Sequence, residues 1–253
     1  MANNYVNFIS DEHLIKCIDI LYNSYLKAKE NLTKETFYKN KIDVIKLTFD
    51  SKFNEISEED LINNEIIRQV DKTITNHIGT FHENILSGIK NFEKLPTGCD
   101  IKSNDNKIFI ELKNKFNTVK GEDSRSIFIK LKELTDKNPG SKGYYARILD
   151  TKKTNKNWEL SYKKVKYKDP SIYIISGDEL YKLMTKEENA LFQLYKILPK
   201  AIDDYLKSIE KDKTVKENSA LDEISSETEK SKRTILDQIT FENYSYYLGF
   251  DKL

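Results

Sequence analysis

The stretch that most constrains this chain is residues 98–115, which read GCDIKSNDNKIFIELKNK. Residues 107–113 have the apolar and β-branched content of a strand that is half inside a core, yet they include a carboxylate and an ammonium. Side chains alternate between the two faces of a strand, so Glu111 and Lys113 share one face with Phe109. Two charges on a face that also carries a large aromatic side chain suggest a function.

The residues upstream predict that the strand belongs to a hairpin. Residues 97–102 predict a second short strand, and the intervening SNDN, residues 103–106, is made of types that tolerate turn conformations. With a loop of two or four residues, Asp100 lies opposite Phe109, on the same face as Glu111 and one diagonal step from it. Such neighbours are about 7–8 Å apart at the backbone, so their carboxylates can share one cation. A three-residue loop would break this parity, and the sequence leaves both loop lengths open.

Two carboxylates and a lysine at the end of a strand suit Mg²⁺, which binds through one or two carboxylates, waters and phosphate oxygens. The alternative is a solvated Glu-x-Lys pair, which is common in a chain that is 33% charged. Two observations favour the metal site. Asp100 has the required offset, and the polar segment 114–118 follows the strand directly.

These residues resemble a known family. Asp100, followed after a short hairpin by Glu111-Leu112-Lys113, resembles the signature of the PD-(D/E)XK nucleases, with Cys99 where that motif often has proline. Over about residues 60–210, the segments FHENIL, ELKNKFNT, WELS and IISGDELYKLMT resemble the type II restriction endonucleases that cut GGNCC-type sites. The ordered set of segments is far more specific than the Asp…Glu-x-Lys pattern alone.

The resemblance implies Mg²⁺-dependent, sequence-specific hydrolysis of double-stranded DNA that leaves 5′-phosphate ends. It implies that Asp100, Glu111 and the backbone carbonyl of Leu112 hold the metal, and that Lys113 orients or helps to deprotonate the attacking water. A palindromic target implies a homodimer. By the same resemblance, a cognate DNA methyltransferase protects the host genome without being a physical partner.

A helix expected at residues 81–92, just before the hairpin, contains two further candidates. Many PD-(D/E)XK enzymes recruit an acid from this helix, and Glu83 is the residue in question. The interpretation we favour is instead that Thr80-x-x-Glu83 is a capping box that begins the helix. His82 lies on the apolar stripe of the helix, so we expect a packed, hydrogen-bonded side chain rather than a general base.

DNA contacts are expected after the catalytic strand and in the lysine-rich segment 152–168, where cations alternate with Trp158, Tyr162 and Tyr167. The alternative for this segment is a solvated strand pair whose aromatic side chains pack on the sheet. Arg125 and Arg147 are candidates for reading guanine, although either could be a surface ion pair. The complete set of candidate DNA-binding residues is Asn114, Lys115, Asn117, Thr118, Lys120, Arg125, Arg147, Lys152 and Lys153.

The order of expected elements predicts a mixed α/β fold, with a central mixed sheet flanked by helices in a restriction-endonuclease-like core. Three regions are expected: a helical N-terminal region (1–78), the nuclease core (79–209), and a charged linker with a C-terminal helix (210–253). Helices are expected at 11–30, 33–49, 58–78, 81–92, 124–137, 186–209 and 235–247, and further strands at 144–149 and 171–175.

Composition limits the remaining possibilities. The formal net charge is +1, which argues against a protein that coats nucleic acid indiscriminately. No signal peptide or membrane-spanning run is visible, so we expect a cytoplasmic protein without a membrane partner, and Cys17 and Cys99 are expected to be reduced. The sequence has no phosphate loop, G-x-S-x-G elbow, dinucleotide fingerprint or Cys/His cluster. Three functions remain as alternatives to a restriction endonuclease. They are a non-catalytic DNA-binding module, a PD-(D/E)XK nuclease of DNA repair, and a structural protein whose helical N-terminal third binds a partner.

Overall fold

The structure, a computed structural model, describes residues 3–209 and 219–247. The chain divides into two compact units. The sheet unit comprises residues 1–21 and 77–210, and the helical unit comprises residues 22–76 and 211–253. The three-region division expected from the sequence stays a prediction.

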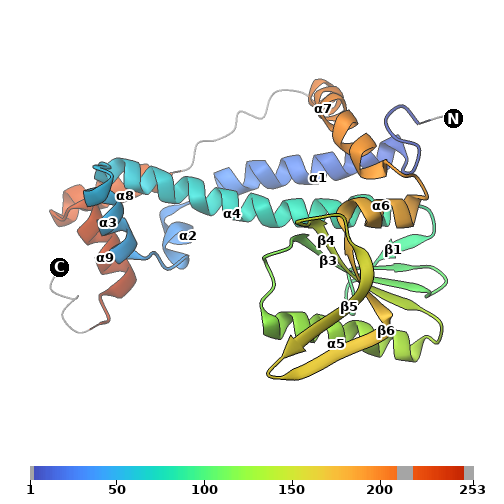
Figure 1. Ribbon diagram of the computed structural model, residues 1–253. Helices are drawn as coiled ribbons and strands as arrows, with labels where there is room; N and C mark the ends of the chain where they lie inside the picture. The colour runs from blue at the N-terminus through green and yellow to red at the C-terminus, as the bar shows by residue number, and fades with distance from the viewer. Residues whose placement is uncertain (1–2, 210–218, 248–253) are drawn as a thin grey trace. The chain divides into compact units, whose positions relative to one another are not determined.

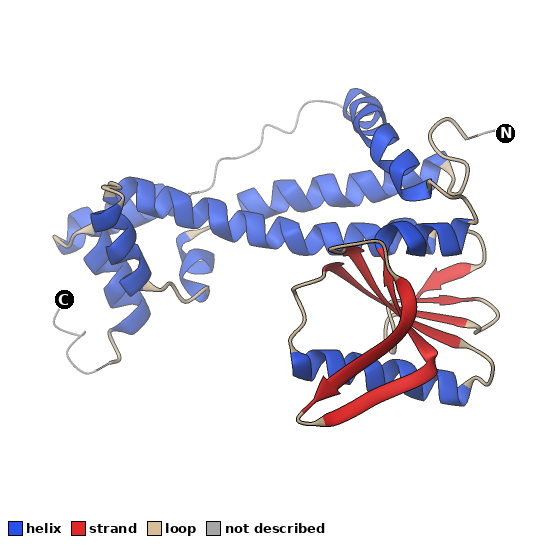
Figure 2. Ribbon diagram, viewed as in Figure 1, coloured by secondary structure: helices blue, strands red, loops and turns tan. Residues whose placement is uncertain are grey.

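The sheet unit is built on a six-stranded mixed sheet of order β1-β2-β3-β4-β6-β5 (Figures 1 and 2). Its central strands β3, β4 and β6 run parallel to one another, while β1, β2 and β5 pair antiparallel with their neighbours. This confirms the predicted mixed α/β class. The strands are β1 (Phe92–Lys94), β2 (Ile101–Ser103), β3 (Ile108–Lys115), β4 (Lys142–Leu149), β5 (Asn155–Tyr162) and β6 (Val165–Ser176).

Helices cover both faces of this sheet. Figure 1 shows α5 (Gly121–Lys137) on one face, and α6 (Gly177–Thr185) with the C-terminal end of α4 (Glu58–Ser87) on the other. Helix α7 (Ala190–Ser208) follows α6. Since α5 connects the parallel strands β3 and β4, it is the crossover helix that such a pair requires.

The core beneath α5 explains why this helix lies on the sheet. Ile127 and Leu131 of α5 are buried, where they pack with Phe109 of β3. Gly143 of β4 allows the close approach, because a Cβ there would lie 3.0 Å from both Leu131 Cβ and Ile172 Cδ1. Burying a side chain such as Leu131 contributes about 1.5–3 kcal/mol, so this contact fixes the position of α5 against β3.

The helical unit contains α2 (Lys34–Lys39), α3 (Val44–Phe53), α8 (Ala220–Ser231) and α9 (Ile235–Tyr244), with parts of α1 (Asp11–Glu30) and α4. Phe37, Ile62, Ile224 and Ile239 are fully or almost fully buried in its core. Buried Asn243 ties two segments together, because its Oδ1 accepts a 3.1 Å hydrogen bond from the backbone nitrogen of Ile42.

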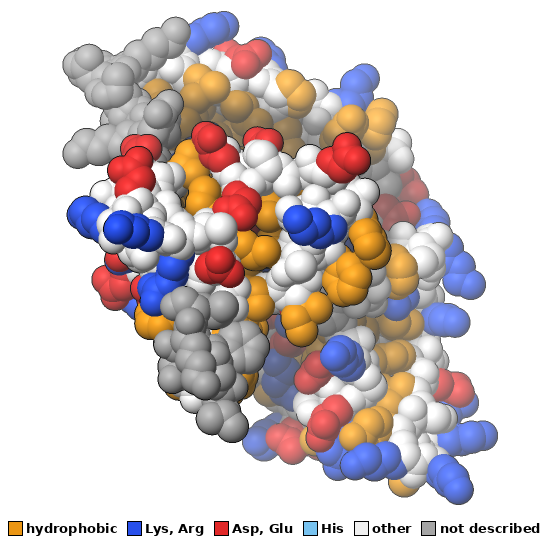
Figure 3. All heavy atoms as spheres, turned by 90° about the vertical axis from the view of Figure 1, so that its left-hand side faces the viewer, with side chains coloured by type: hydrophobic (Ala, Val, Ile, Leu, Met, Phe, Trp, Pro, Cys, Tyr) orange, Lys and Arg blue, Asp and Glu red, His pale blue; other side chains and the backbone are white. Residues whose placement is uncertain are grey.

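The surface has no dominant sign of charge on the face drawn in Figure 3, where acidic, basic and apolar side chains are interspersed. This agrees with the near-zero net charge of the sequence. Some apolar side chains are well exposed, among them Ile45, Phe49 and Phe53 of α3. Within residues 3–209 and 219–247, no helix has both the length and the apolar character that crossing a bilayer requires.

Several predicted elements agree with the structure. Helix α1 has the predicted bounds, and the Ser10 hydroxyl caps it by accepting a hydrogen bond from the backbone nitrogen of His13. Other elements differ. Residues 33–49 form two helices, because the chain breaks at Asn40 and restarts at the N-cap Asp43. Helix α6 was not foreseen; it ends at Lys186, which has a left-handed φ of 68°, and α7 begins at Ala190 rather than at residue 186 as expected.

The largest difference concerns α4. It runs without interruption from Glu58 to Ser87, whereas separate helices at 58–78 and 81–92 were expected. Gly79 therefore does not end a helix; a glycine inside a helix costs only about 1 kcal/mol, which a long packed helix tolerates. Short strand β1 replaces the end of the second expected helix. Of the expected charged linker, residues 210–218 lie outside the described residues, and residues 219–232 are mostly α8, whose Ala220 and Ile224 are buried.

Candidate active site

The hairpin formed by β2 and β3 brings Asp100 and Glu111 together. Its register pairs Ile101 with Ile110, and the backbone nitrogen of Asp100 donates a 3.0 Å hydrogen bond to the Ile110 carbonyl. Asp100 and Glu111 are the next residues along the two strands beyond this pair. The expected parity is therefore correct, but the pairing of Asp100 with Phe109 is wrong by two residues, and Phe109 instead pairs with Lys102.

The loop explains the shift. It comprises residues 104–107, one residue later than predicted, and its own polar side chains close it. The Ser103 hydroxyl accepts a 2.9 Å hydrogen bond from the backbone nitrogen of Ile108 and donates one of 2.6 Å to Asp105. Asn106 adopts a left-handed φ of 55°, which asparagine tolerates better than most residues. Because of these side-chain hydrogen bonds, β2 continues to Ser103, one residue beyond the predicted end of the strand at Lys102.

Glu111 is a buried carboxylate held by two ammonium groups. Only 5% of the residue is exposed. Its Oε1 lies 2.9 Å from Nζ of Lys113 in the same strand, and its Oε2 contacts Nζ of Lys130 from α5. A buried charge is tolerated only when it is paired and hydrogen-bonded, and the two lysines supply these partners.

The charges of Glu111 and Glu83 act on the pKa of both Asp100 and Lys113. Asp100 Oδ2 accepts a 2.7 Å hydrogen bond from the backbone nitrogen of Leu112. Burial raises the pKa of Asp100, and the charge of Glu111 raises it further. Burial lowers the pKa of Lys113, but its hydrogen bond to Glu111 and the charges of Glu111, Asp100 and Glu83 outweigh that effect, so the net pKa is raised.

Glu83 belongs to this charge cluster, and it is not a helix cap. Because α4 is continuous through Thr80, the predicted capping box does not exist. Glu83 instead forms a 2.8 Å ion pair with Lys94 of β1, which also donates a 3.0 Å hydrogen bond to the Asn84 side chain. The negative charge of Glu83 raises the pKa of both Asp100 and Lys113. Its role as a further acid of the site stays a prediction.

The oxygen-only donor set fits a hard divalent cation such as Mg²⁺, which usually takes one or two carboxylates and completes its shell with waters and phosphate oxygens. In the part of the chain that the structure describes, no three Asp, Glu, His or Cys side chains are grouped to hold a metal, so Glu83 does not join Asp100 and Glu111 as a third ligand in this arrangement. The repulsion that raises the pKa of Asp100 is the interaction that a cation between two carboxylates relieves.

The candidate DNA-binding residues fall into two groups. Arg125, Arg147 and Lys153 have partners within the protein: Arg125 Nε donates to the Tyr167 hydroxyl at 2.8 Å, Arg147 pairs with Asp150 at 2.6 Å, and Lys153 pairs with Glu179 at 2.8 Å. The remaining candidates lie around the end of β3, at the start of α5 and in the loop after β4. All are exposed except half-buried Asn114: Asn114, Lys115, Asn117, Thr118, Lys120 and Lys152.

The aromatic residues of segment 152–168 mainly serve the core. Trp158 is buried and packs on Tyr145, with ring centroids 4.6 Å apart. Tyr167 packs edge-on against Phe128. For Trp158 and Tyr167, the alternative of a strand pair with packed aromatics is therefore correct, and the lysines of β5 and β6 remain at the surface.

His82 and the cysteines have the structural roles expected of them. His82 Nδ1 lies 3.1 Å from the Tyr181 hydroxyl, and burial lowers the pKa of His82 to about 4. Cys17 and Cys99 are free and buried, and burial raises the pKa of each thiol to about 11. None of these groups suits a nucleophile or a general base at neutral pH.

Sequence reasoning missed Lys130 and Lys94. Lys130 was hard to recognise because α5 is rich in lysine, and the only signal was its position three residues after inward-facing Ile127. Lys94 lies on β1, a strand of three residues that carries little periodicity of its own.

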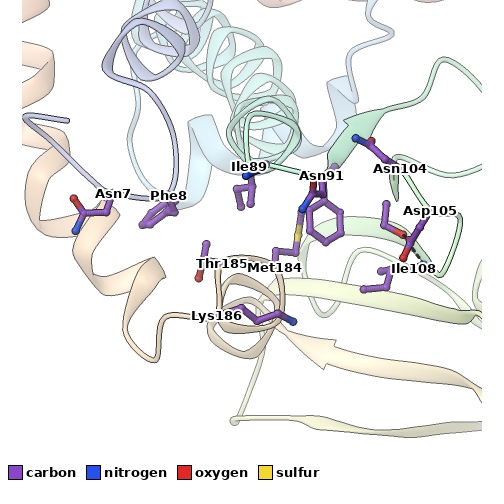
Figure 4. A pocket seen from close by; sticks show the side chains of 13 residues that line it. Asn7, Phe8, Ile89, Asn91, Asn104, Asp105, Ile108, Met184, Thr185 and Lys186 are labelled. Atoms are coloured by element: carbon purple, nitrogen blue, oxygen red, sulfur yellow. Dashed lines mark hydrogen bonds between the residues drawn. The ribbon is translucent and has the colours of Figure 1, made fainter. Parts of the chain in front are cut away.

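A cavity of about 510 Å³ lies at the other end of β3 (Figure 4). Ile108, at the start of that strand, contributes to its wall with Phe8 and Met184. Lys113 is five residues further along β3, which corresponds to about 17 Å at the rise of a strand. The cavity is therefore separate from the carboxylate pair.

A mixed sheet with a hairpin that presents two carboxylates and a lysine defines the class that the sequence resemblance implied, a restriction-endonuclease-like hydrolase. Comparison with known proteins identifies the family. The family model described as Eco47II restriction endonuclease matches residues 6–207. The chain belongs to this family, and the predicted type II restriction endonuclease is confirmed. Enzymes of this class act on double-stranded DNA and use a divalent metal ion.

Two relatives illustrate the match. The type II restriction enzyme Sau96I of Staphylococcus aureus is 39% identical over 265 aligned positions, covering 99% of this chain and 100% of the relative. The type II restriction enzyme Eco47II of Escherichia coli is 32% identical over 210 positions, covering 78% of this chain and 87% of the relative.

Proposed function

We propose that this endonuclease hydrolyses both strands of DNA at a short GGNCC-type palindrome, using Mg²⁺ held by Asp100 and Glu111. The single observation that carries the proposal is the β2–β3 hairpin, which brings these two carboxylates close enough for their charges to repel, with Lys113 bonded to Glu111. A non-catalytic DNA-binding module would give no reason to bury Glu111 between two ammonium groups beside a second, repelled carboxylate. The GGNCC site rests on the resemblance of ELKNKFNT and its flanking segments.

Each residue has a distinct part in the reaction. Asp100, Glu111 and the backbone carbonyl of Leu112 would hold Mg²⁺ beside the scissile phosphate. When bound, such an ion neutralises phosphate charge and acidifies a water molecule. The raised pKa of Lys113 keeps its Nζ protonated, which favours a hydrogen-bond donor and a positive charge over a base. Lys113 would therefore orient the attacking water and stabilise the extra negative charge that develops on the phosphate oxygens.

The products would carry 5′-phosphate and 3′-hydroxyl ends. A palindromic target presents the same sequence on both strands, so two copies of the chain related by a two-fold axis would each cut one strand. The expected setting is the cytoplasm, where a cognate DNA methyltransferase would protect the host genome. Exposed Lys115, Asn117 and Thr118, which follow the catalytic strand, would contact the DNA backbone.

The test is cleavage of phage DNA by the purified full chain with Mg²⁺, with and without EDTA. Discrete fragments that require Mg²⁺ and whose sequenced ends share a GGNCC-type site are expected. Glu111→Ala should abolish the fragments, whereas Glu133→Ala, which removes an exposed acid of α5, should not. Retarded but intact DNA would favour the binding module, and fragments without a common end sequence would favour a repair nuclease. Cleavage by Glu111→Ala at the wild-type rate would overturn the assigned site.

A further inference from the structure

Helix α7 has two apolar faces, and only one of them is covered. Ala190, Leu194, Ala201 and Tyr205 are buried. At 100° per residue, a second apolar set lies on the opposite side of the helix. This set, here called the α7 seam, consists of Phe192 (59% exposed), Tyr195 (71%), Pro199, Ile202 (40%) and Leu206 (37%).

The spacing of the α7 seam is that of a helix-pairing surface. Its residues recur at intervals of three, four, three and four, which is the pattern of the two apolar positions in each heptad of paired helices. Single exposed apolar residues are ordinary on protein surfaces, but an aligned set of this kind marks an interaction site. The seam covers about 21 Å of helix. Because Pro199 removes a helical hydrogen bond at its centre, the seam suits a short crossing of two helices.

We propose that the α7 seam pairs with the α7 seam of a second copy of this chain, antiparallel and about a two-fold axis. This inference rests on the homodimer of the proposed function and names its surface. A two-fold axis requires a patch that is complementary to itself. An apolar stripe in the middle of a helix meets that requirement when the two helices cross in opposite directions.

The charges beside the seam are also self-complementary. Lys196 and Asp203 flank it on the same side, and both are exposed. Lys196 stacks on the Phe192 ring at 5.6 Å, and the described residues provide no ion pair for Asp203. An antiparallel pairing with Tyr195 against the partner's Leu206 places Lys196 beside the partner's Asp203, and the two-fold axis repeats this pair. A parallel pairing would instead face these charges with Leu191 and Leu198, which can form no ion pair.

The exposed stripe on α3, made by Ile45, Phe49 and Phe53, lacks this feature. The adjacent Lys46 and Asp50 already pair with each other within the helix. Phe53, which is 77% exposed, therefore provides a matched control outside the proposed surface.

The first experiment is sedimentation equilibrium of the full chain without DNA. Wild type is expected to dimerise, and Tyr195→Glu is expected to weaken the dimer at least 100-fold. The Phe53→Glu control should behave as wild type. Since Tyr195 is 71% exposed, its replacement should leave the circular dichroism spectrum and the melting temperature unchanged. Wild-type sedimentation by Tyr195→Glu would overturn the proposal.

The second experiment tests the antiparallel register. Lys196→Glu should weaken the dimer about tenfold, because two ion pairs are lost and two like-charge contacts form. The double variant Lys196→Glu/Asp203→Lys should return to within about twofold of wild type, since it exchanges the charges and keeps the pairing. Failure of the double variant to recover would contradict the register.

The outcomes also separate this proposal from the proposed function. A wild-type chain that stays monomeric both free and on DNA in Ca²⁺, yet cuts both strands, would exclude the homodimer itself. A dimer that none of these substitutions alters would exclude only the α7 seam. Variants that stay dimeric but lose DNA affinity would show that the seam contacts DNA, which also overturns the proposal.

Discussion

Lys130 of α5 contacts one carboxylate oxygen of Glu111, while Lys113 contacts the other from within β3. Lys113 is therefore a local partner, two residues from Glu111 in the same strand. Lys130 is a distant partner, which contacts Glu111 only because α5 packs on the sheet. The side chain of Lys130 is 38% exposed, so it can leave Glu111 for solvent or for a phosphate. The two lysines therefore differ in what they do when a cation approaches.

We expect Lys130→Gln to tighten the binding of Mg²⁺ or Mn²⁺ to the free protein. A divalent cation competes with the Lys130 ammonium for Glu111, and removing one partly exposed charge is worth about 1 kcal/mol, or roughly fivefold in affinity. Calorimetric titration with Mn²⁺ would measure the change. Lys132→Gln is the control, because Lys132 pairs with Asp136 and Asp169 instead. Weaker metal binding by Lys130→Gln would show that Lys130 supports the site rather than competing for it.

Asp100→Asn should stabilise the metal-free protein while removing cleavage. The pKa of Asp100 is raised in the folded state, so this carboxylate is less favourable there than in the unfolded chain at neutral pH, and the cost disappears as pH falls and the group is protonated. The amide oxygen can still accept the Leu112 hydrogen bond. Thermal melts at pH 7.5 should show a higher Tm for Asp100→Asn in EDTA, and a smaller increase with Mg²⁺ than for wild type. Equal Mg²⁺-induced shifts would argue that Asp100 is not a ligand.

Lys113→Ala should reduce turnover much more than DNA affinity. A charge that acts on the developing phosphate charge contributes mainly in the transition state, and losing one typically costs about two to three orders of magnitude in rate. Single-turnover cleavage with DNA and Mg²⁺ both saturating would measure the rate, and a binding isotherm in Ca²⁺ would measure the affinity. If turnover persists while affinity collapses, Lys113 anchors a phosphate and is not catalytic.

Lys115→Ala should weaken DNA binding and reduce the salt dependence of the binding constant by about one unit of slope. Lys115 is exposed where β3 ends, beyond Lys113. Binding isotherms over a range of NaCl concentrations, with Ca²⁺ present, provide the slope. Lys107→Ala is the control, since Lys107 lies just before β3 at its other end, where its Nζ bonds to the Pro139 carbonyl. The same slope for both variants would remove Lys115 from the DNA interface.

His82 should make the folded protein sensitive to mild acid. The folded pKa of about 4 lies below the unfolded value near 6.5, so only the unfolded chain takes up this proton as the pH falls between them. The stability that neutral His82 provides is complete above about pH 6.5 and is lost toward pH 4, by about 3 kcal/mol. Urea unfolding of wild type and His82→Gln across this range should show the difference, with His77→Gln as the control. Parallel stability curves for wild type and His82→Gln would contradict it.

Local patterns predicted the parts of the site that depend on nearby residues. Alternation along β3 places Glu111 and Lys113 on one face, and the polar composition of residues 103–106 predicts a turn. The exact register was not predictable from composition, because the hydrogen bonds of Ser103 and Asp105 decide it. A loop one residue later in the chain shifts the pairing by two residues, so that Lys102 rather than Asp100 lies opposite Phe109.

Interactions between distant segments account for the remaining errors. Gly79 and Thr80 have the local character of a helix break and a helix start, yet tertiary packing carries α4 through both. Lys130 reaches Glu111 only because α5 lies against β3, a relationship that no local periodicity contains. The three residues of β1 were missed for the same reason, since they form a strand only through pairing with β2.

The parallel pairing of β3 with β4 sets the order in which a catalytic centre can form. The β2–β3 hairpin closes over a few residues, so Asp100 and Glu111 can meet early in folding, at little cost in loop entropy. Strand β3 joins the rest of the sheet only when β4 pairs with it and β6 pairs with β4. These pairings require α5 to fold between β3 and β4, and such non-local pairings form slowly. A chain interrupted during synthesis before Ser176 would hold the metal-binding carboxylates without the sheet that aligns them. Nuclease activity is therefore expected only of a chain that extends at least to the end of β6 at Ser176.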